Sequence, residues 1–269
     1  MKKELYFVKL GGSVITDTQK PSTPRKAEIS RLLGEIQVAR EAKDFQIILG
    51  HGGGSFGHFP AKKYRINEGI INSDSMKGFV ETQNAMHNLN MLITDAAIKA
   101  QLSPHPFTPS SFAYSSGKKI VGGTLEGIRN SLDAGSMPIV HGDGMSDSRQ
   151  GISIASTEEV FRFLLSGIKP DKIIIGTDMD GVFDSDPRTN PSAKLIPVVD
   201  SSNIDAILSS SASGAQKVDV TGGMKTKLET LYGMVKSTGA QGYIANASKP
   251  RVIENLLMGN HVECTSVRL

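Results

Sequence analysis

The sequence has little cysteine, no tryptophan and no long apolar run. Its 269 residues include one cysteine, Cys264, and aromatic residues make up only 6% of the chain. A single cysteine excludes an intrachain disulfide and is typical of a reducing compartment. No apolar run approaches the roughly 18–20 residues that a membrane-spanning helix needs. We therefore expect a cytoplasmic protein whose fold depends on neither disulfides nor a membrane.

Other missing patterns argue against several classes of protein. The six histidines show no H-x-x-x-H spacing, and with one cysteine they offer no typical zinc site. The net charge is only +3, and the basic residues form scattered pairs rather than a stripe for nucleic acid. We expect no metal site built from side chains and no nucleic-acid partner.

Short β-branched runs alternate along the chain with longer segments of helical period. This alternation predicts an α/β fold, a single domain over residues 1–269 with a mostly parallel sheet covered by helices. Segments 184–193 and 201–217 are rich in Ser, Asp, Asn and Pro and are expected to be loops. The expected strands are residues 5–10, 45–49, 138–141, 172–176, 242–245 and 264–267. The expected helices are residues 25–42, 75–100, 124–134, 157–165, 224–236 and 249–257.

Two glycine-rich loops follow expected strands. The first is K-L-G-G-S at residues 9–13, and the second is H-G-G-G-S-F-G-H at residues 51–58. Glycines let backbone N–H groups approach a ligand closely, and a helix N-terminus attracts anions. Lys9 is well placed to meet phosphate charge, and His58 can donate a hydrogen bond to a phosphate oxygen. His51, at the strand end, is more simply a structural histidine.

Three further segments repeat this chemistry: H-G-D-G at 141–144, T-D-M-D-G-V-F at 177–183 and D-V-T-G-G-M-K-T-K at 219–227. The carboxylates of Asp178 and Asp180 can hold a metal or a ribose or close a turn, with ligand contact favoured for Asp178. Lys225 and Lys227 lie in the first turn of an expected helix, where positive charge is unfavourable for the helix dipole. A bound anion explains their presence better than helix stability does. Positive charge around a migrating group is what phosphoryl transfer requires.

In this order, the five motifs resemble the amino acid kinase superfamily across nearly the whole chain. The histidine that closes the 51–58 motif is similar to that of the isopentenyl phosphate kinases within it. The resemblance implies an open αβα sandwich, a homodimer, and direct in-line transfer of the γ-phosphate of Mg-ATP to isopentenyl phosphate. The N-terminal part is then expected to bind the acceptor and the C-terminal part ATP.

The resemblance also implies roles for individual residues. Lys9, His58 and Lys227 are expected to be catalytic. Isopentenyl phosphate is expected to contact Gly53, Gly54, Gly57, His58 and Thr157, with its tail along Phe79, Gln83 and Met86. The residues expected to contact ATP are Lys9, Gly11, Gly12, Ser13, Gly54, Asp178, Asp180, Val182, Gly223, Lys225 and Lys227.

The chain departs from the superfamily pattern at two places. Thr18 stands where relatives carry a lysine, and we hypothesise that Lys20 reaches in to replace it. Relatives carry S-G-D where this chain has Ser156, Thr157 and Glu158, so a side chain at the glycine position could narrow the pocket or shift the acceptor. Two alternatives therefore stay open: a fosfomycin-type or other small phosphate or phosphonate kinase, and a catalytically impaired nucleotide-binding sensor.

Overall fold

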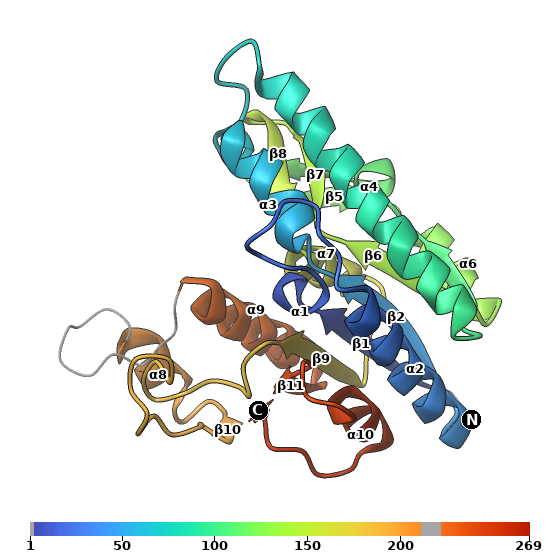
Figure 1. Cartoon of the computed structure of the whole chain (residues 1–269), viewed down its shortest axis with the longest axis vertical. Coiled ribbons are helices and arrows are strands. Elements are labelled where there is room, and N and C mark those ends of the chain that lie inside the picture. Colours follow the sequence, from blue (N-terminus) through green and yellow to red (C-terminus); the bar gives the residue numbers. More distant parts are fainter. Residues whose placement is uncertain (1–2, 211–221) are drawn as a thin grey trace.

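A mostly parallel sheet of eight strands forms the centre of the computed structural model, which describes residues 3–210 and 222–269 (Figure 1). Its strand order is β10-β12-β11-β9-β1-β2-β6-β3, and the pair β11–β12 is antiparallel. These strands are β1 (Glu4–Leu10), β2 (Phe45–His51), β3 (Pro104–Pro106), β6 (Met137–His141), β9 (Lys172–Thr177), β10 (Val198–Val199), β11 (Gln241–Asn246) and β12 (Thr265–Val267). The predicted α/β class with a mostly parallel sheet is confirmed.

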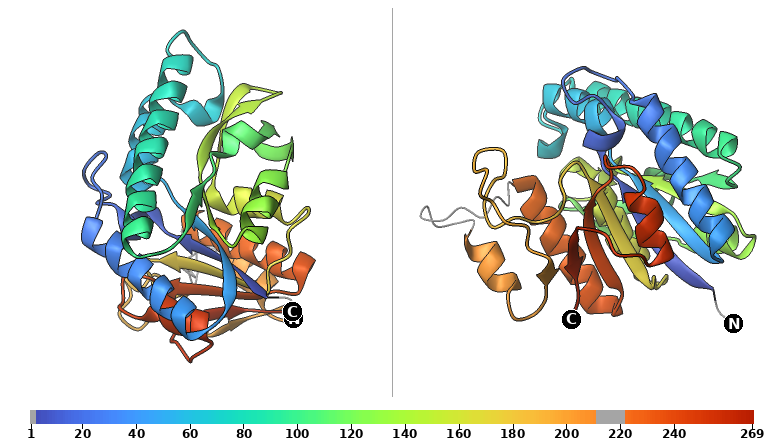
Figure 2. Two further views of the ribbon diagram at one scale, coloured as in Figure 1. Left: turned by 90° about the vertical axis from the view of Figure 1, so that its right-hand side faces the viewer. Right: turned by 60° about the horizontal axis from the view of Figure 1, so that its bottom comes forward.

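Helices cover both faces of this sheet (Figure 2). One face packs against α2 (Lys26–Ala42), α4 (Ser75–Lys99) and α10 (Val252–Met258). The other packs against α6 (Glu126–Asp133), α7 (Thr157–Leu164) and α9 (Gly222–Thr238). The remaining helices are α1 (Gly12–Ile15), α3 (Gly54–Lys63), α5 (Pro109–Phe112), α8 (Ile204–Ser210) and the short 3₁₀ helix η1 (Ile66–Glu68). Among the described helices, none combines the length and the apolar character that crossing a membrane requires.

The alternation of side chains along β1 decides where Lys9 points. Tyr6, Val8 and Leu10 join the core on the α2 side, whereas Leu5 and Phe7 join the core on the α7 and α9 side. Successive side chains of a strand point to opposite faces. Lys9 therefore emerges on the face covered by α7 and α9.

Six strands were not among the expected ones. β3 and β10 lie at the two ends of the central sheet, and the other four form a second, smaller sheet. They are β4 (Ala113–Ser116), β5 (Lys119–Gly123), β7 (Asp143–Asp147) and β8 (Gly151–Ala155), in the order β5-β4-β7-β8. With α3 and α4 they make the upper part of the molecule in Figure 1. The sequence of β7, D-G-M-S-D, is too polar to show the alternation of a half-buried strand.

Other boundaries also differ from expectation. The expected loop 201–217 contains helix α8, and its residues 211–217 lie outside the described residues, as do residues 219–221 of the last motif. The helix expected over 249–257 begins only at Val252, because Arg251 before it has a left-handed backbone (φ 64°). Segment 184–193 is a loop, as predicted.

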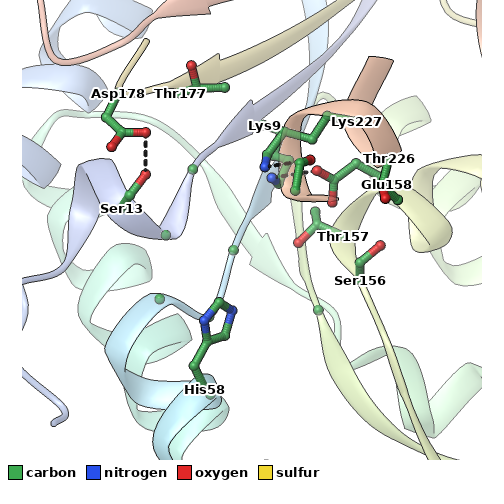
Figure 3. A pocket seen from close by; sticks show the side chains of 18 of the residues that line it. Lys9, Ser13, His58, Ser156, Thr157, Glu158, Thr177, Asp178, Thr226 and Lys227 are labelled. Atoms are coloured by element: carbon green, nitrogen blue, oxygen red, sulfur yellow. Dashed lines mark hydrogen bonds and ion pairs between the residues drawn. The ribbon is translucent and has the colours of Figure 1, made fainter. Parts of the chain in front are cut away.

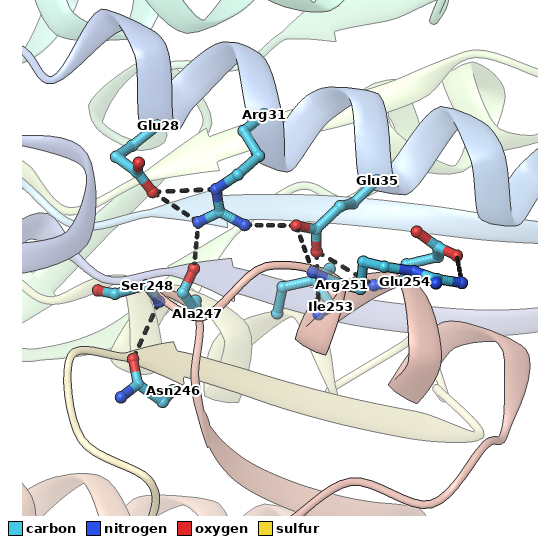
Figure 4. A network of polar contacts seen from close by, with 9 residues as sticks. All are labelled: Glu28, Arg31, Glu35, Asn246, Ala247, Ser248, Arg251, Ile253 and Glu254. Carbon is cyan, nitrogen blue, oxygen red and sulfur yellow. Dashed lines mark hydrogen bonds and ion pairs between the residues drawn. The ribbon is translucent and has the colours of Figure 1, made fainter.

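A buried carboxylate joins α2 to α10 (Figure 4). Glu35 accepts hydrogen bonds from the backbone N–H groups of Arg251 (2.8 Å), Ile253 (3.2 Å) and Glu254 (3.4 Å), and from the side chain of Arg31. The first N–H groups of a helix have no partner within the helix, so Glu35 satisfies the start of α10 from a distant part of the chain. Arg31 also donates to the carbonyl oxygen of Ala247 (2.6 Å), which fixes the chain after β11.

This arrangement predicts that Glu35→Ala lowers the free energy of unfolding by about 2–4 kcal/mol, because it leaves buried N–H groups at the start of α10 without an acceptor and removes one acceptor of the Arg31 guanidinium. Urea unfolding followed by circular dichroism measures the loss. Glu41→Ala, an exposed glutamate on the same helix, is the control and should change stability by less than about 0.5 kcal/mol. Equal unfolding midpoints for the two variants would contradict this role of Glu35.

Candidate active site

A cavity of about 590 Å³ opens at the carboxyl ends of β1, β2, β6 and β9. Ligands of open α/β sheets gather at this edge. The cavity brings together most of the residues that the sequence singled out (Figure 3). Those in its wall are Lys9, Gly11, Gly12, Ser13, Gly53, Gly54, Gly57, His58, Met86, Thr157, Asp178, Gly223 and Lys227.

Lys9 and Glu158 form a buried ion pair in this cavity. The Nζ of Lys9 lies 2.7 Å from Oε1 of Glu158, and the two side chains are 6% and 11% exposed. Glu158 stands in the first turn of α7, where Ser156 accepts a hydrogen bond from the Glu159 N–H (3.1 Å) and caps the helix. Burial pushes the pKa of Glu158 upward, but attraction by Lys9 outweighs it and holds the pKa below its ordinary value. The carboxylate thus stays charged and holds the lysine in place.

Lys227 and His58 add further positive or protonatable groups to the same cavity. Burial, and then repulsion by Lys9, lower the pKa of Lys227. Burial, followed by repulsion from Lys227 and Lys9, lowers the pKa of His58. In Figure 3, Lys9 and Lys227 lie together while His58 rises from α3 toward them. A cavity in which three such groups repel one another is suited to an anion, which would relieve that repulsion.

The two glycine-rich loops touch each other. A Cβ atom on Gly12 would lie 2.3 Å from the backbone nitrogen of Gly54, and Gly54 itself has a positive φ of 46°. The N–H of Gly52 donates to the carbonyl oxygen of Leu10 (2.9 Å). Only glycine permits this approach of one backbone to another. The two glycine-rich loops are therefore in direct backbone contact.

Asp178 joins the loop after β9 to the first glycine-rich loop. The Ser13 hydroxyl donates to its carboxylate (2.9 Å). Both residues lie in the cavity wall. A carboxylate and a hydroxyl at this position can bind the hydroxyl groups or the cation of a nucleotide.

Thr157 does not block the cavity, although it stands where the resemblance expects glycine. Its side chain is turned toward the sheet, where the hydroxyl donates to the carbonyl oxygen of His51 (2.7 Å). A Cβ atom on Gly50 would lie 2.6 Å from the Thr157 methyl group, so Gly50 leaves room for it. The side chain is 98% buried, with only 2% of the residue exposed.

Besides Phe79 and Gln83, which are described below, four of the predicted cavity residues lie outside the cavity wall. Lys20 is 72% exposed and lies 3.9 Å from Asp17, so it does not replace the missing lysine at Thr18, which does line the cavity. Lys225 donates to the Leu208 carbonyl oxygen (2.9 Å) of α8. Lys225 therefore contacts α8, whereas Lys227 lines the cavity.

The other two are Asp180 and Val182. Asp180 accepts a hydrogen bond from Asn246 (3.0 Å) and pairs with Lys249 (2.6 Å), outside the cavity wall. The side chain of Val182 is fully buried in the core. The run after β9 alternates: Met179, Gly181 and Phe183 line the cavity, whereas Asp180 and Val182 do not.

Phe79 and Gln83 stand behind the wall rather than in it. Gln83 donates to the Ser110 hydroxyl (3.2 Å) and to the Gly144 carbonyl oxygen (3.0 Å). The cavity is instead lined by Thr82 and Met86, which lie on the neighbouring face of α4. Residues on both faces recur at helical spacing, so the sequence does not show which face lines the cavity. Other cavity residues that it did not single out are Ala61, Ile154, Phe183, Met224 and Thr226.

His51 is structural, as the sequence favoured. It is completely buried, its Nε2 lies 3.1 Å from Oδ1 of Asn90, and it is not in the cavity wall. Burial, reinforced by repulsion from His141, lowers the pKa of His51 to about 3. The ring is therefore neutral near pH 7.

Comparison with known proteins gives the chain a family. Residues 4–246 match the amino acid kinase family. The chain belongs to that family. It is 33% identical to an isopentenyl phosphate kinase of Methanothermobacter thermautotrophicus and 34% identical to one of Methanocaldococcus jannaschii, and each match covers 98% of both chains.

Solved structures of this family superpose over the full chain. A structure of isopentenyl phosphate kinase has a TM-score of 0.83 at 30% identity and covers 98% of this chain and 99% of its own. The product complex of the Thermoplasma acidophilum isopentenyl phosphate kinase has a TM-score of 0.80 at 25% identity, with coverage of 98% and 100%. The open αβα sandwich expected from the sequence is the fold of this family.

The charges in the cavity predict how His58 responds to a substitution. Lys227→Met removes a cation that repels the protonated imidazole, so the pKa of His58 should rise toward 6.5. Titration of the His58 ring signals by NMR in the ligand-free protein measures the shift. Lys63→Met, which removes an exposed charge at the end of the same helix α3, is the control. The interpretation is wrong if both variants move the His58 titration equally, or if neither does.

Proposed function

We propose that this chain is an isopentenyl phosphate kinase, which transfers the γ-phosphoryl group of ATP to isopentenyl phosphate. Full-length relatives carry that name, and the geometry of the cavity supports it. The observation that carries the proposal is the direct contact of the two glycine-rich loops, with Lys9, Lys227 and His58 in the wall of the one cavity that both loops line. Such a cavity fits two phosphate-bearing molecules end to end.

Each loop takes one substrate in this proposal. The first loop, Gly11 to Ser13, holds the phosphates of ATP together with Lys9, Gly223 and Lys227. The second loop, Gly53 to Gly57, holds the phosphate of the acceptor with His58. Asp178 faces the nucleotide beside Ser13.

Transfer then needs one displacement. An oxygen of the acceptor phosphate forms a bond to the γ-phosphorus, and the bond from that phosphorus to the β–γ bridging oxygen breaks. The electron pair of the broken bond leaves with ADP, and isopentenyl diphosphate is formed. Lys9 and Lys227 stabilise the charge that spreads over the migrating group, and Glu158 keeps Lys9 oriented.

His58 is suited to the acceptor phosphate because its protonation responds to that charge. In the ligand-free cavity, burial and then the two lysines lower its pKa. A dianionic phosphate beside the ring acts in the opposite direction and favours the protonated, donating form. The histidine therefore gains its positive charge where the acceptor binds.

Magnesium would enter with ATP. In residues 3–210 and 222–269, no three His, Cys, Asp or Glu side chains are grouped to hold a metal ion. The site thus fits an ion coordinated mainly by nucleotide phosphates and water, with Asp178 as the carboxylate that would face it. When bound, Mg²⁺ would offset the negative charge of the nucleotide phosphates.

The acceptor end of the cavity favours an isoprenoid tail over the compact, polar fosfomycin. Beyond His58 the wall includes Ala61, Met86 and Ile154, whose side chains are apolar. The Met86 sulfur packs beneath the second loop, since a Cβ atom on Gly53 would lie 2.7 Å from it. The retained Lys9–Glu158 ion pair likewise argues against an impaired sensor.

A homodimer is part of the proposal, as the resemblance implies. Four large apolar side chains of α4 are exposed in the single chain: Met76, Val80, Met91 and Ile98. Light scattering gives the mass directly, to be compared with 28.8 kDa for one chain.

Steady-state assays with ATP and Mg²⁺ test the function. Isopentenyl phosphate should be turned over at roughly 1–100 s⁻¹, the range typical of kinases, and dimethylallyl phosphate, geranyl phosphate and fosfomycin are the competing acceptors. If fosfomycin were the preferred acceptor, the chain would instead be a phosphonate kinase. ATP binding without transfer to any acceptor would make it a sensor.

His58→Ala locates the acceptor phosphate in the same assay. We expect kcat/KM for isopentenyl phosphate to fall about 10²–10³-fold, as when one charge-stabilising donor is removed, with the KM for ATP nearly unchanged. His261→Ala, an exposed histidine outside the cavity wall, is the control. Equal losses for the two substrates would show that His58 does not belong to the acceptor site.

A further inference from the structure

Thr16 is bonded to both glycine-rich loops at once. It follows α1 and is completely buried. Its hydroxyl donates to the carbonyl oxygen of Gly12 (2.7 Å) in the first loop and accepts from the N–H of Ser55 (3.0 Å) in the second. One side-chain oxygen therefore links the two loops, although 39 residues separate Thr16 from Ser55 in the sequence.

The hydroxyl lies directly against the loop backbones. A Cβ atom on Gly54 would lie 2.1 Å from the Thr16 Oγ1, and Gly54 has its positive φ at this point. Gly12 and Gly54 line the cavity, whereas Thr16 is not in its wall. The threonine thus supports the two loops from behind and does not touch the space that ligands would occupy.

A second connection runs through Ser55. Its hydroxyl accepts from the Thr23 N–H (3.2 Å), and its carbonyl oxygen accepts from the Ser22 N–H (3.2 Å). The loop between Thr16 and Thr23 is therefore seated on the first turn of α3. Thr18, which lines the cavity, belongs to this loop.

We propose that Thr16 is a positioning residue that sets the spacing of the two phosphate-binding loops and so the alignment of the two phosphates for transfer. The inference rests on the proposed phosphoryl transfer between these loops. Any shift of one loop against the other must break one of two buried hydrogen bonds. An in-line displacement loses rate steeply when its reactants are misplaced by about 1 Å.

Thr16→Val and Thr16→Ser separate this role from simple packing. Valine fills the same space without a hydroxyl, and serine keeps the hydroxyl without the methyl group. We expect Thr16→Val to lower kcat by about 10- to 100-fold while the KM values for ATP and isopentenyl phosphate stay within about threefold. Thr16→Ser should restore most of kcat.

Thr238 offers a matched control. Its buried hydroxyl also donates to the carbonyl oxygen four residues earlier, that of Met234 (2.7 Å), and accepts from an N–H, that of Ala240 (3.1 Å). It lies at the end of α9, roughly 16 Å along the helix from Lys227 at 1.5 Å per residue. Thr238→Val should lower the melting temperature as Thr16→Val does and leave kcat unchanged.

Amide hydrogen exchange provides a readout that does not need activity. Thr16→Val should speed exchange in the peptide that contains Ser55, and Thr238→Val should not. If the wild-type chain phosphorylates no acceptor, the proposed function fails, and the exchange result still decides whether Thr16 holds the loops together.

Three results would overturn the inference: unchanged exchange at Ser55, equal kcat for Thr16→Val and Thr238→Val, or a serine variant no more active than the valine variant. Thr16→Ala is measured in the same way if Thr16→Val does not fold.

Discussion

The contact between the backbones of the two glycine-rich loops is the constraint on which the rest of the site depends. Gly12 and Gly54 approach so closely that neither position tolerates a Cβ atom. Each loop ends a parallel strand, β1 or β2, and these strands are neighbours in the sheet. Adjacent parallel strands therefore deliver the two glycine-rich turns to one point at the edge of the sheet.

Positive charge is concentrated around that point, and in the ligand-free protein these charges repel one another. Lys9 and Lys227 repel each other and disfavour the protonated form of His58, and Glu158 offsets part of the repulsion through its ion pair with Lys9. Positive charge fixed before the ligand arrives needs little rearrangement during transfer. Interactions outside the cavity, such as the carboxylate of Glu35 at the start of α10, stabilise the framework that bears this charge.

The sequence predicts the residues that lie in continuous motifs at strand ends. Lys9, the glycines and His58 fall there, and the shared edge of parallel strands brings them together. The family model and the full-length relatives agree with the resemblance that those motifs carry.

The sequence fails where orientation depends on packing. It could not choose between Lys225 and Lys227, because two residues of one helix turn differ only in the direction they face. It pointed to Phe79 and Gln83 instead of Thr82, because residues on two adjacent faces of α4 recur at helical spacing. Ile154 was missed because β8 is short and packs in a second sheet that no periodicity revealed.

The stereochemical course at phosphorus tests most directly whether the two loops hold donor and acceptor face to face. The experiment uses ATP whose γ-phosphorus is made chiral by sulfur and a heavy oxygen isotope, with isopentenyl phosphate as acceptor. A single in-line displacement between the loops predicts inversion of configuration in the product. Retention would require two displacements through a phosphorylated side chain and would contradict direct transfer.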